Sequence, residues 1–255
     1  MVCQKQLTNL NKQQIIINNY FYDFWLKMLF NFDKIEFDNR PFDHWIMDDF
    51  LDVNDAITLS SQFIDYDNPT EEIIHYNGWI GEKRTCNRWD RFPPLTYSTF
   101  SNLLSVDFIS KLSDVTGISP LYPDIGLHGG GWHMSGDGGS LAVHLDYSIH
   151  PKLNLQRKLN LIIYLEEDYD SDWGGSLQFW SHDDKNKKPL NLIKEVEPIF
   201  NRAILFDTTQ HSWHGFPESI NLPDGKLRKS VALYYMTDIS SSAEVRYRAQ
   251  YTDVN

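Results

Sequence analysis

A closely spaced histidine and aspartate, with a second histidine far along the sequence, most constrain how this 255-residue chain can fold. His144 and Asp146 lie two residues apart, and His214 follows 68 positions later (214 − 146). Residues i and i+2 of a β-strand point to the same side, so the first two can reach one ligand from the end of a single strand. His214 follows the apolar run 203–206, which predicts a second strand. A shared site requires such distant strands to lie side by side, as they do in a β-sandwich or jelly roll.

These three side chains form a donor set that suits Fe(II). Two imidazoles and one carboxylate on one face of a metal ion leave the other coordination positions open to exogenous ligands. A structural zinc site would instead use four closed protein ligands, commonly cysteines. The chain has only two cysteines, Cys3 and Cys86, too few for a cysteine-based metal site or a disulfide framework. We therefore predict an open, catalytic metal site.

A basic residue, Arg228, follows the three candidate metal ligands along the sequence. Arg228 stands 14 positions after His214 (228 − 214) and opens the strand-like run 228–235. The next residues on its strand face are Ser230 and Ala232, which are small and leave room for a short dicarboxylate. Arginine suits the far end of such a molecule because its planar guanidinium can make two hydrogen bonds to a carboxylate. The pattern favours 2-oxoglutarate as the co-substrate, with Arg228 rather than Lys229 facing inward.

In combination, these motifs resemble the 2-oxoglutarate and Fe(II)-dependent dioxygenases, specifically their prolyl-4-hydroxylase-like branch. The resemblance runs from about residue 129 to 237 and rests on the order and spacing of the H-x-D triplet and of segments 159–165, 173–176, 206–208, 214–215 and 228–230. It implies a double-stranded β-helix, a jelly-roll or cupin-like core, with iron at its open end. The interval before Arg228 is longer than the family's usual one, and an insertion at 218–225, with the turn signal Pro-Asp-Gly, absorbs the difference.

The resemblance also implies an activity and the residues that perform it. It implies hydroxylation of an unactivated C–H bond of a peptidyl, prolyl-type or small-molecule substrate, with 2-oxoglutarate and O2 consumed, succinate and CO2 released, and ascorbate as a candidate reductant. The implied metal ligands are His144, Asp146 and His214, and the implied co-substrate contacts are Arg228, Tyr164 and Ser230. The alternative is a cupin-like jelly roll that binds a ligand or metal without oxidising anything.

Other histidines compete for the same roles. A second H-x-D stands at His182–Asp184, but its polar surroundings predict a solvated turn. His211 lies near His214, yet residues three apart in an extended segment face opposite sides. His133, on a predicted strand, either lines the cofactor wall or is satisfied by local contacts.

Charge and composition narrow the partners. A formal charge of −12 repels phosphate backbones and disfavours nucleic acid, which leaves peptide, protein or small-molecule substrates. The most apolar stretch, residues 15–32, is interrupted by Asn18, Asn19, Asp23 and Lys27 and makes a poor membrane span. Its aromatic residues suggest contact with the body of the protein or with a second copy in a homodimer. No secretory signal is visible, so we expect a cytoplasmic protein.

The length and pattern predict one domain over residues 1–255. We expect an N-terminal helical extension over 1–35, helical support and loops over 36–128, and the β core over 129–238. The front part contains a short strand at 43–47, a helix capped by Asp52 or Asn54, a loop-rich segment at 76–94, and a helix over 102–115 ended by Gly117. The loop-rich segment and residues 147–152 are candidate substrate contacts. Eight core strands are expected near 131–134, 141–144, 159–165, 176–180, 193–198, 203–207, 213–216 and 228–237.

Overall fold

The computed structural model describes residues 29–67 and 79–254. The predicted helical extension over 1–35 falls mostly outside these ranges, and its last residue begins strand β1 (Ile35–Asp38). The dimer contact predicted for the aromatic stretch also lies outside the described residues and stays a prediction, as does the single-domain assignment. In the described part of the chain, no helix is both long enough and apolar enough to cross a bilayer.

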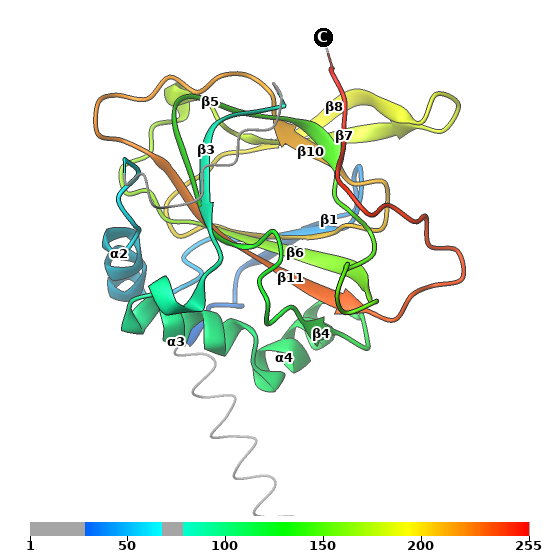
Figure 1. The fold of residues 1–255 in the computed structure, drawn as a ribbon, viewed down its shortest axis with the longest axis horizontal. Coiled ribbons are helices and arrows are strands. Elements are labelled where there is room, and N and C mark those ends of the chain that lie inside the picture. The colour runs from blue at the N-terminus through cyan, green and yellow to red at the C-terminus, as the bar shows by residue number, and fades with distance from the viewer. Residues whose placement is uncertain (1–28, 68–78, 255) are drawn as a thin grey trace, which may run out of the picture.

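The described residues form one curled antiparallel sheet of 12 strands (Figure 1). After β1 the strands are β2 (His44–Met47), β3 (Ile80–Cys86), β4 (Tyr122–Pro123), β5 (Gly131–Leu145), β6 (Gln156–Tyr164), β7 (Leu177–Asp183), β8 (Lys188–Val196), β9 (Ala203–Asp207), β10 (Trp213–Phe216), β11 (Arg228–Thr237) and β12 (Gln250–Tyr251). Their order is β1-β2-β9-β6-β11-β5-β10-β7-β8, with β3 and β12 paired to β5 and β4 paired to β11. This is the double-stranded β-helix predicted from the sequence.

Strand β5 joins the two layers of the sheet. Its first part pairs with β11, where Ser135 lies opposite Arg228, and its last part pairs with β10, where His144 lies opposite His214. Between these parts Gly138 has a φ of 74°, a conformation that glycine adopts without steric cost. As a result β7, β8 and β10 form a layer opposite β6 and β11 (Figure 1).

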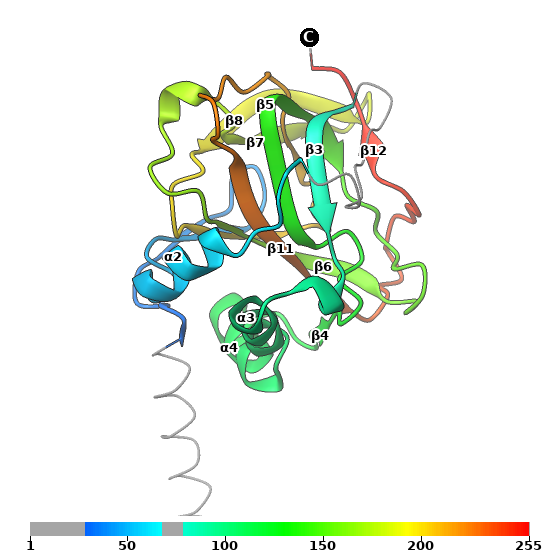
Figure 2. The same ribbon diagram turned by 60° about the vertical axis from the view of Figure 1, so that its left-hand side comes forward.

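Helices cover the outer face of β6 and β11 (Figures 1 and 2): α2 (Val53–Ser61), α3 (Pro94–Leu103) and α4 (Val106–Thr116), with short 3-10 helices η1 (Trp89–Arg91) and η2 (Ser171–Trp173) in connecting segments. Alternate strand residues pack against α3 and α4 in one core, and these are Leu159, Leu161, Ile163, Val231, Leu233 and Tyr235. The hydroxyl of Tyr235 also donates to the carbonyl of Leu103 at 2.9 Å. The intervening strand residues are thereby turned toward the other face of the sheet.

The predicted helix signals are confirmed at two of the helix ends. The carboxylate of Asp52 accepts hydrogen bonds from the backbone of Asn54 and Asp55 and so caps α2. Gly117 ends α4 with a φ of 70°. The start of α4, however, is Val106 rather than residue 102, because Ser105 accepts a hydrogen bond from the backbone of Phe108 and caps the helix there.

Two parts of the predicted layout are wrong. The segment 76–94 is not only loop, since it contains β3, and Pro94 opens the helix α3, which the apolar pattern did not predict. Strand β3 carries Lys83 and Arg84 and has no clear alternation, so its extended form comes from pairing with β5. The strands expected at 131–134 and 141–144 are one continuous strand, β5.

The side chain of Asn201 bonds the backbone of the loop before α2, which generates a testable prediction. The Asn201 amide accepts from the backbone N–H of Leu51 at 2.9 Å and donates to its carbonyl at 2.8 Å, and Asn201 is buried with a φ of 62°. Asn201→Ala should lower the free energy of unfolding by about 3 kcal/mol, because two buried backbone groups lose their partners.

Urea denaturation measures this loss, and Asn154→Ala is the matched control. Asn154 has a φ of 52° but is exposed, so its replacement carries the same backbone strain without the buried hydrogen bonds. Equal losses in the two variants would show that the Asn201 side chain adds nothing to stability.

Candidate active site

A cavity of about 770 Å³ lies between the two layers of the sheet. It is lined from β3, β5, β6, β10, β11 and the C-terminal residues, and its charged lining residues are Lys83, Asp146, Arg157, Arg228 and Arg248. Four cations thus face one anion, in a chain whose formal charge is −12. This reversal of sign attracts anionic ligands into the cavity.

His144, Asp146 and His214 meet in this cavity. One ligand atom from each lies within 4.8 Å of the others, and all three residues are buried. His144 ends the β5 ladder beside β10, Asp146 follows just beyond the strand, and His214 lies directly opposite His144. The two rings have centroids 4.3 Å apart, and His144 Nε2 lies 3.7 Å from Asp146 Oδ1. Strand pairing therefore brings together the three residues that the sequence separates.

The histidines of this group are prepared to bind a cation. His144 Nδ1 lies 2.9 Å from the carbonyl of Ala142, and His214 Nδ1 lies 2.8 Å from that of Ser212. Because a carbonyl only accepts, each Nδ1 donates and each Nε2 keeps its lone pair. Burial, followed by the neighbouring His144, lowers the pKa of His214 to about 4, so its ring is neutral at physiological pH.

The carboxylate completes the fit to a divalent ion. Asp146 Oδ2 is buried and has no hydrogen-bond partner among the described residues. Its other oxygen lies 3.2 Å from Arg157 Nη1. Burial opposes ionisation of Asp146, but the Arg157 charge and the two histidines outweigh it and hold the pKa of Asp146 well below its usual range. Two imidazole nitrogens and one ionised, unpaired carboxylate oxygen are the donor set that Fe(II) accepts.

Arg157 is a site residue that the sequence did not reveal. Its guanidinium lies between the rings of Tyr147 and Tyr234, 3.4 and 3.3 Å from their centroids, and it donates to the carbonyl of His128 at 3.0 Å. Cation–π contacts on both faces fix its position beside Asp146. An arginine on a strand has no motif of its own, so only the folded contacts identify it.

Arg228 occupies the other side of the cavity as a buried cation. Its Nε donates to the carbonyl of Gly175 at 2.8 Å and its Nη2 donates to the hydroxyl of Tyr164 at 3.1 Å. Its guanidinium also lies 4.2 Å from the ring centroid of Phe216. No carboxylate of the described residues pairs with it, and leaving a buried charge unpaired is costly. A ligand carboxylate would remove that cost, so the site fits one end of 2-oxoglutarate.

The remaining predicted co-substrate residues lie on the same wall. Ser230 is paired with Tyr164 across β11 and β6, and both line the cavity. Lys229 points away and makes an ion pair with Glu166 at 3.0 Å. The inward cation is therefore Arg228, as the sequence predicts.

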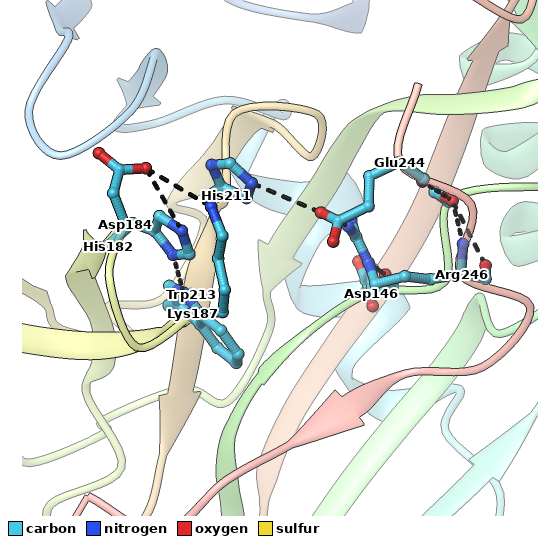
Figure 3. Close-up of polar contacts among 9 residues, drawn as sticks. Asp146, His182, Asp184, Lys187, His211, Trp213, Glu244 and Arg246 are labelled. Atoms are coloured by element: carbon cyan, nitrogen blue, oxygen red, sulfur yellow. Dashed lines mark hydrogen bonds and ion pairs between the residues drawn. The ribbon is translucent and has the colours of Figure 1, made fainter. Parts of the chain in front are cut away.

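The C-terminal residues also reach the site. Residues 244–252, here called the C-terminal strap, run along the end of β5. Within them Tyr251 stacks on His144 with centroids 5.0 Å apart, and Arg246 donates to the carbonyl of Asp146 at 3.1 Å (Figure 3). Glu244 in turn accepts from Arg246 at 2.9 Å. The strap is thereby tied to two of the three residues that can hold the metal.

The candidate substrate segments reach the cavity only in part. Trp79, Ile80, Lys83, Thr85 and Asn87 of the segment 76–94 line it, whereas Tyr147 is the only lining residue within 147–152 among those described. His133 also lines the cavity, and burial lowers its pKa well below its ordinary value. Of the two alternatives for His133, the structure supports a place in the cavity wall.

The two rival histidines pair with each other outside the triad (Figure 3). The rings of His182 and His211 stack with centroids 3.9 Å apart, and His182 Nδ1 accepts from Trp213 Nε1 at 2.9 Å. His211 Nε2 lies 3.4 Å from Glu244 Oε2. The prediction of a solvated turn is wrong for His182, because this stack and hydrogen bond hold it on β7.

Comparison with known proteins agrees with this geometry. The model of the 2OG-Fe(II) oxygenase superfamily matches residues 130–236. Prolyl 3-hydroxylase OGFOD1 of Mus musculus is 25% identical over 207 residues, which make up 80% of this chain and 35% of that protein. The Xenopus laevis protein of the same name is 32% identical over 79 residues, or 31% of this chain and 15% of that protein. The chain thus spans about a third or less of the length of these curated relatives.

Solved structures share the fold. A prolyl hydroxylase of Trichoplax adhaerens, in complex with a hypoxia inducible factor oxygen degradation domain peptide fragment, aligns with a TM-score of 0.52 and 16% identity over 76% of this chain and 83% of its own. HygX of Streptomyces hygroscopicus, with nickel, 2-oxoglutarate and hygromycin B bound, aligns with a TM-score of 0.52 and 14% identity over 82% and 92%.

The matched segment contains both histidines and the aspartate of the triad, as well as the inward-facing arginine. Sequence, fold and site chemistry therefore agree. Residues 130–236 match the 2OG-Fe(II) oxygenase superfamily, the dioxygenases that use Fe(II) and 2-oxoglutarate, and the chain is similar to prolyl hydroxylases in sequence and in fold.

Proposed function

We propose that this protein hydroxylates a prolyl residue of a peptide or protein, consuming 2-oxoglutarate and O2 and releasing succinate and CO2. The observation that carries the proposal is that one cavity holds both the open triad of His144, Asp146 and His214 and the buried, unpaired cation Arg228. The prolyl target is proposed because the curated relatives and a structural neighbour are named as prolyl hydroxylases. No feature of the described residues favours the non-catalytic alternative.

The triad residues would hold the metal from one side. Bound Fe(II) supplies the coupling between oxidative decarboxylation of 2-oxoglutarate and hydroxylation of a C–H bond. His144 and His214 each present a fixed Nε2, because their Nδ1 atoms are bonded to backbone carbonyls. Arg157 keeps the Asp146 carboxylate ionised beside them. The two imidazole rings and the carboxylate are therefore positioned for metal binding by contacts within the protein itself.

The co-substrate would bind between the triad and Arg228. Arg228 and the hydroxyl of Tyr164 would hold its distal carboxylate, with Ser230 beside them on the same wall. Tyr164 is fully buried, and burial raises its pKa, so it binds as a neutral hydroxyl. The C-terminal strap narrows the cavity above the triad and limits access of bulk water to the reacting groups.

We also propose that the protein lies in the cytoplasm, because the cytoplasm supplies reduced iron and 2-oxoglutarate. Ascorbate is the proposed reductant for returning the metal to Fe(II).

The first prediction from the proposed function concerns the metal. Replacing His144, Asp146 or His214 by Ala should weaken Fe(II) binding on the order of 100-fold or more, because each removes one of three ligands. Anaerobic equilibrium dialysis measures this. His211→Ala is the control and should bind Fe(II) normally, since its ring faces Glu244. Tight stoichiometric Fe(II) binding by His214→Ala would place the metal elsewhere.

The second prediction concerns the co-substrate. In an anaerobic titration of the Fe(II) protein with 2-oxoglutarate, a visible metal-to-ligand charge-transfer band should appear. Arg228→Met should raise the Kd for 2-oxoglutarate on the order of 100-fold, because a charged hydrogen-bond donor is lost. Lys229→Met removes the same charge from the opposite strand face and should leave the Kd unchanged. An unaltered Kd in Arg228→Met would exclude this residue as the carboxylate anchor.

The third prediction concerns the reaction. Aerobic incubation of the wild-type protein with Fe(II), 2-oxoglutarate and a proline-scanning peptide library should yield peptides heavier by one oxygen atom, together with matching succinate. Tandem mass spectrometry would locate the hydroxyl on proline. Asp146→Ala should form neither product. A wild-type protein that gives no charge-transfer band and no succinate would instead support the non-catalytic binding alternative.

A further inference from the structure

Lys83 on β3 shares a row of the sheet with Arg228. Lys83 is paired with Ser135 of β5, and Ser135 is paired on its other side with Arg228 of β11. Residues directly opposite each other in an antiparallel pair project from the same face. All three line the cavity. Lys83 therefore enters the same space as Arg228, from the other side of β5.

The next row along these strands has the same arrangement. Thr85 is paired with His133, His133 with Ser230, and Ser230 with Tyr164, and all four line the cavity. The two rows form a continuous polar wall. Arg228 leans toward the β6 side of this wall, where it contacts Tyr164 and Gly175. The β3 side is left to Lys83, which supplies the second cation of the wall.

Lys83 has no counter-ion in the described part of the chain. By contrast, Lys158, Lys194, Lys226 and Lys229 each make an ion pair with a carboxylate. Lys83 touches the cavity but lies deep in the molecule, and this burial, with Arg228 second, lowers its pKa to about 8. Asp146 opposes that shift, but its carboxylate is already engaged by Arg157. The ammonium group is thus placed in the cavity without a protein anion of its own.

We propose that Lys83 is a second cation for 2-oxoglutarate and binds the dianion together with Arg228. The inference rests on the proposed function, and it adds a residue from β3, outside the 130–236 segment that matches the family. Lys83 interacts electrostatically with Arg228 and with Asp146, at the two ends of the space that the co-substrate would span. Because Lys83 lies in the same row as Arg228, we assign its ligand as the co-substrate and not as an acidic group of the peptide. A peptide would enter at the cavity mouth, where the exposed Tyr247 and Arg248 lie.

The test measures 2-oxoglutarate binding to the 255-residue Fe(II) protein without oxygen, using the charge-transfer band. Lys83→Met should raise the Kd on the order of tenfold, because one charged interaction is lost. Lys83→Arg keeps the charge and should restore most of the affinity. Arg84→Met is the matched control: it removes a cation from the adjacent position, which lies over the ring of Tyr66 and not in the cavity, and should leave the Kd unchanged.

The dependence on pH separates a charge role from a structural one. The charged and titratable groups that face Lys83 are Arg228 on β11, His133 on β5 and Asp146 beyond β5. As pH rises from 7 to 9, Lys83 loses its proton near its lowered pKa of about 8, so wild-type affinity for 2-oxoglutarate should fall. Lys83→Arg stays charged and should show a flatter profile, measured by calorimetry on the Mn(II)-loaded protein.

The outcomes separate this inference from the proposed function. If the wild-type protein binds no 2-oxoglutarate, the proposed function itself fails. If wild type and Lys83→Met bind it equally, with parallel pH profiles, only the inference is overturned. A Lys83→Met protein that keeps its Kd for 2-oxoglutarate but loses peptide hydroxylation would also overturn it, and would place Lys83 on the substrate side.

Discussion

The two-residue alternation of β6 and β11 is the constraint on which the rest of the structure depends. One face of these strands carries Leu and other apolar residues that pack under α3 and α4. The other face carries Tyr164, Arg228 and Ser230 and lines the cavity. A shift of one residue in register would exchange the two faces, placing a guanidinium in the apolar core. Packing of the helices therefore also orients the site.

The chemistry of the cavity follows from how its charges are balanced. In a chain of net charge −12, the cavity wall is predominantly cationic. The charge of Arg157 is balanced by Asp146, and its guanidinium also contacts two aromatic rings and a backbone carbonyl. Arg228 has only neutral partners, so its charge is left for a ligand. The protein thus keeps a carboxylate ionised next to the metal position while presenting an unbalanced cation farther along the wall.

Segments on both sides of the family-like core complete the site. Strand β3 precedes that core in the sequence and contributes Lys83 and Thr85, while the strap follows it and contributes Tyr251. Both segments pair with β5, the strand that carries His144. The strap pairs with β5 at His144 itself, and β3 pairs along the part of β5 that lines the cavity wall. Substitutions in β3 or in the C-terminal strap can therefore change which ligands the cavity binds without changing His144, Asp146 or His214.

The sequence by itself predicted the fold class, the grouping of His144, Asp146 and His214, and the inward-facing Arg228, because each motif lies on or just beyond a single strand: H-x-D at the end of β5, His-Gly on β10, and an arginine that opens the alternating β11. Strands β9, β10 and β11 also have the predicted bounds. Tertiary structure alone decided the rest. Strand β3 is extended because β5 offers it a partner, and His182 is held by Trp213 rather than by solvent. Arg157 reaches Asp146 only because non-adjacent strands fold together, and contacts between such strands leave no periodic trace in the sequence.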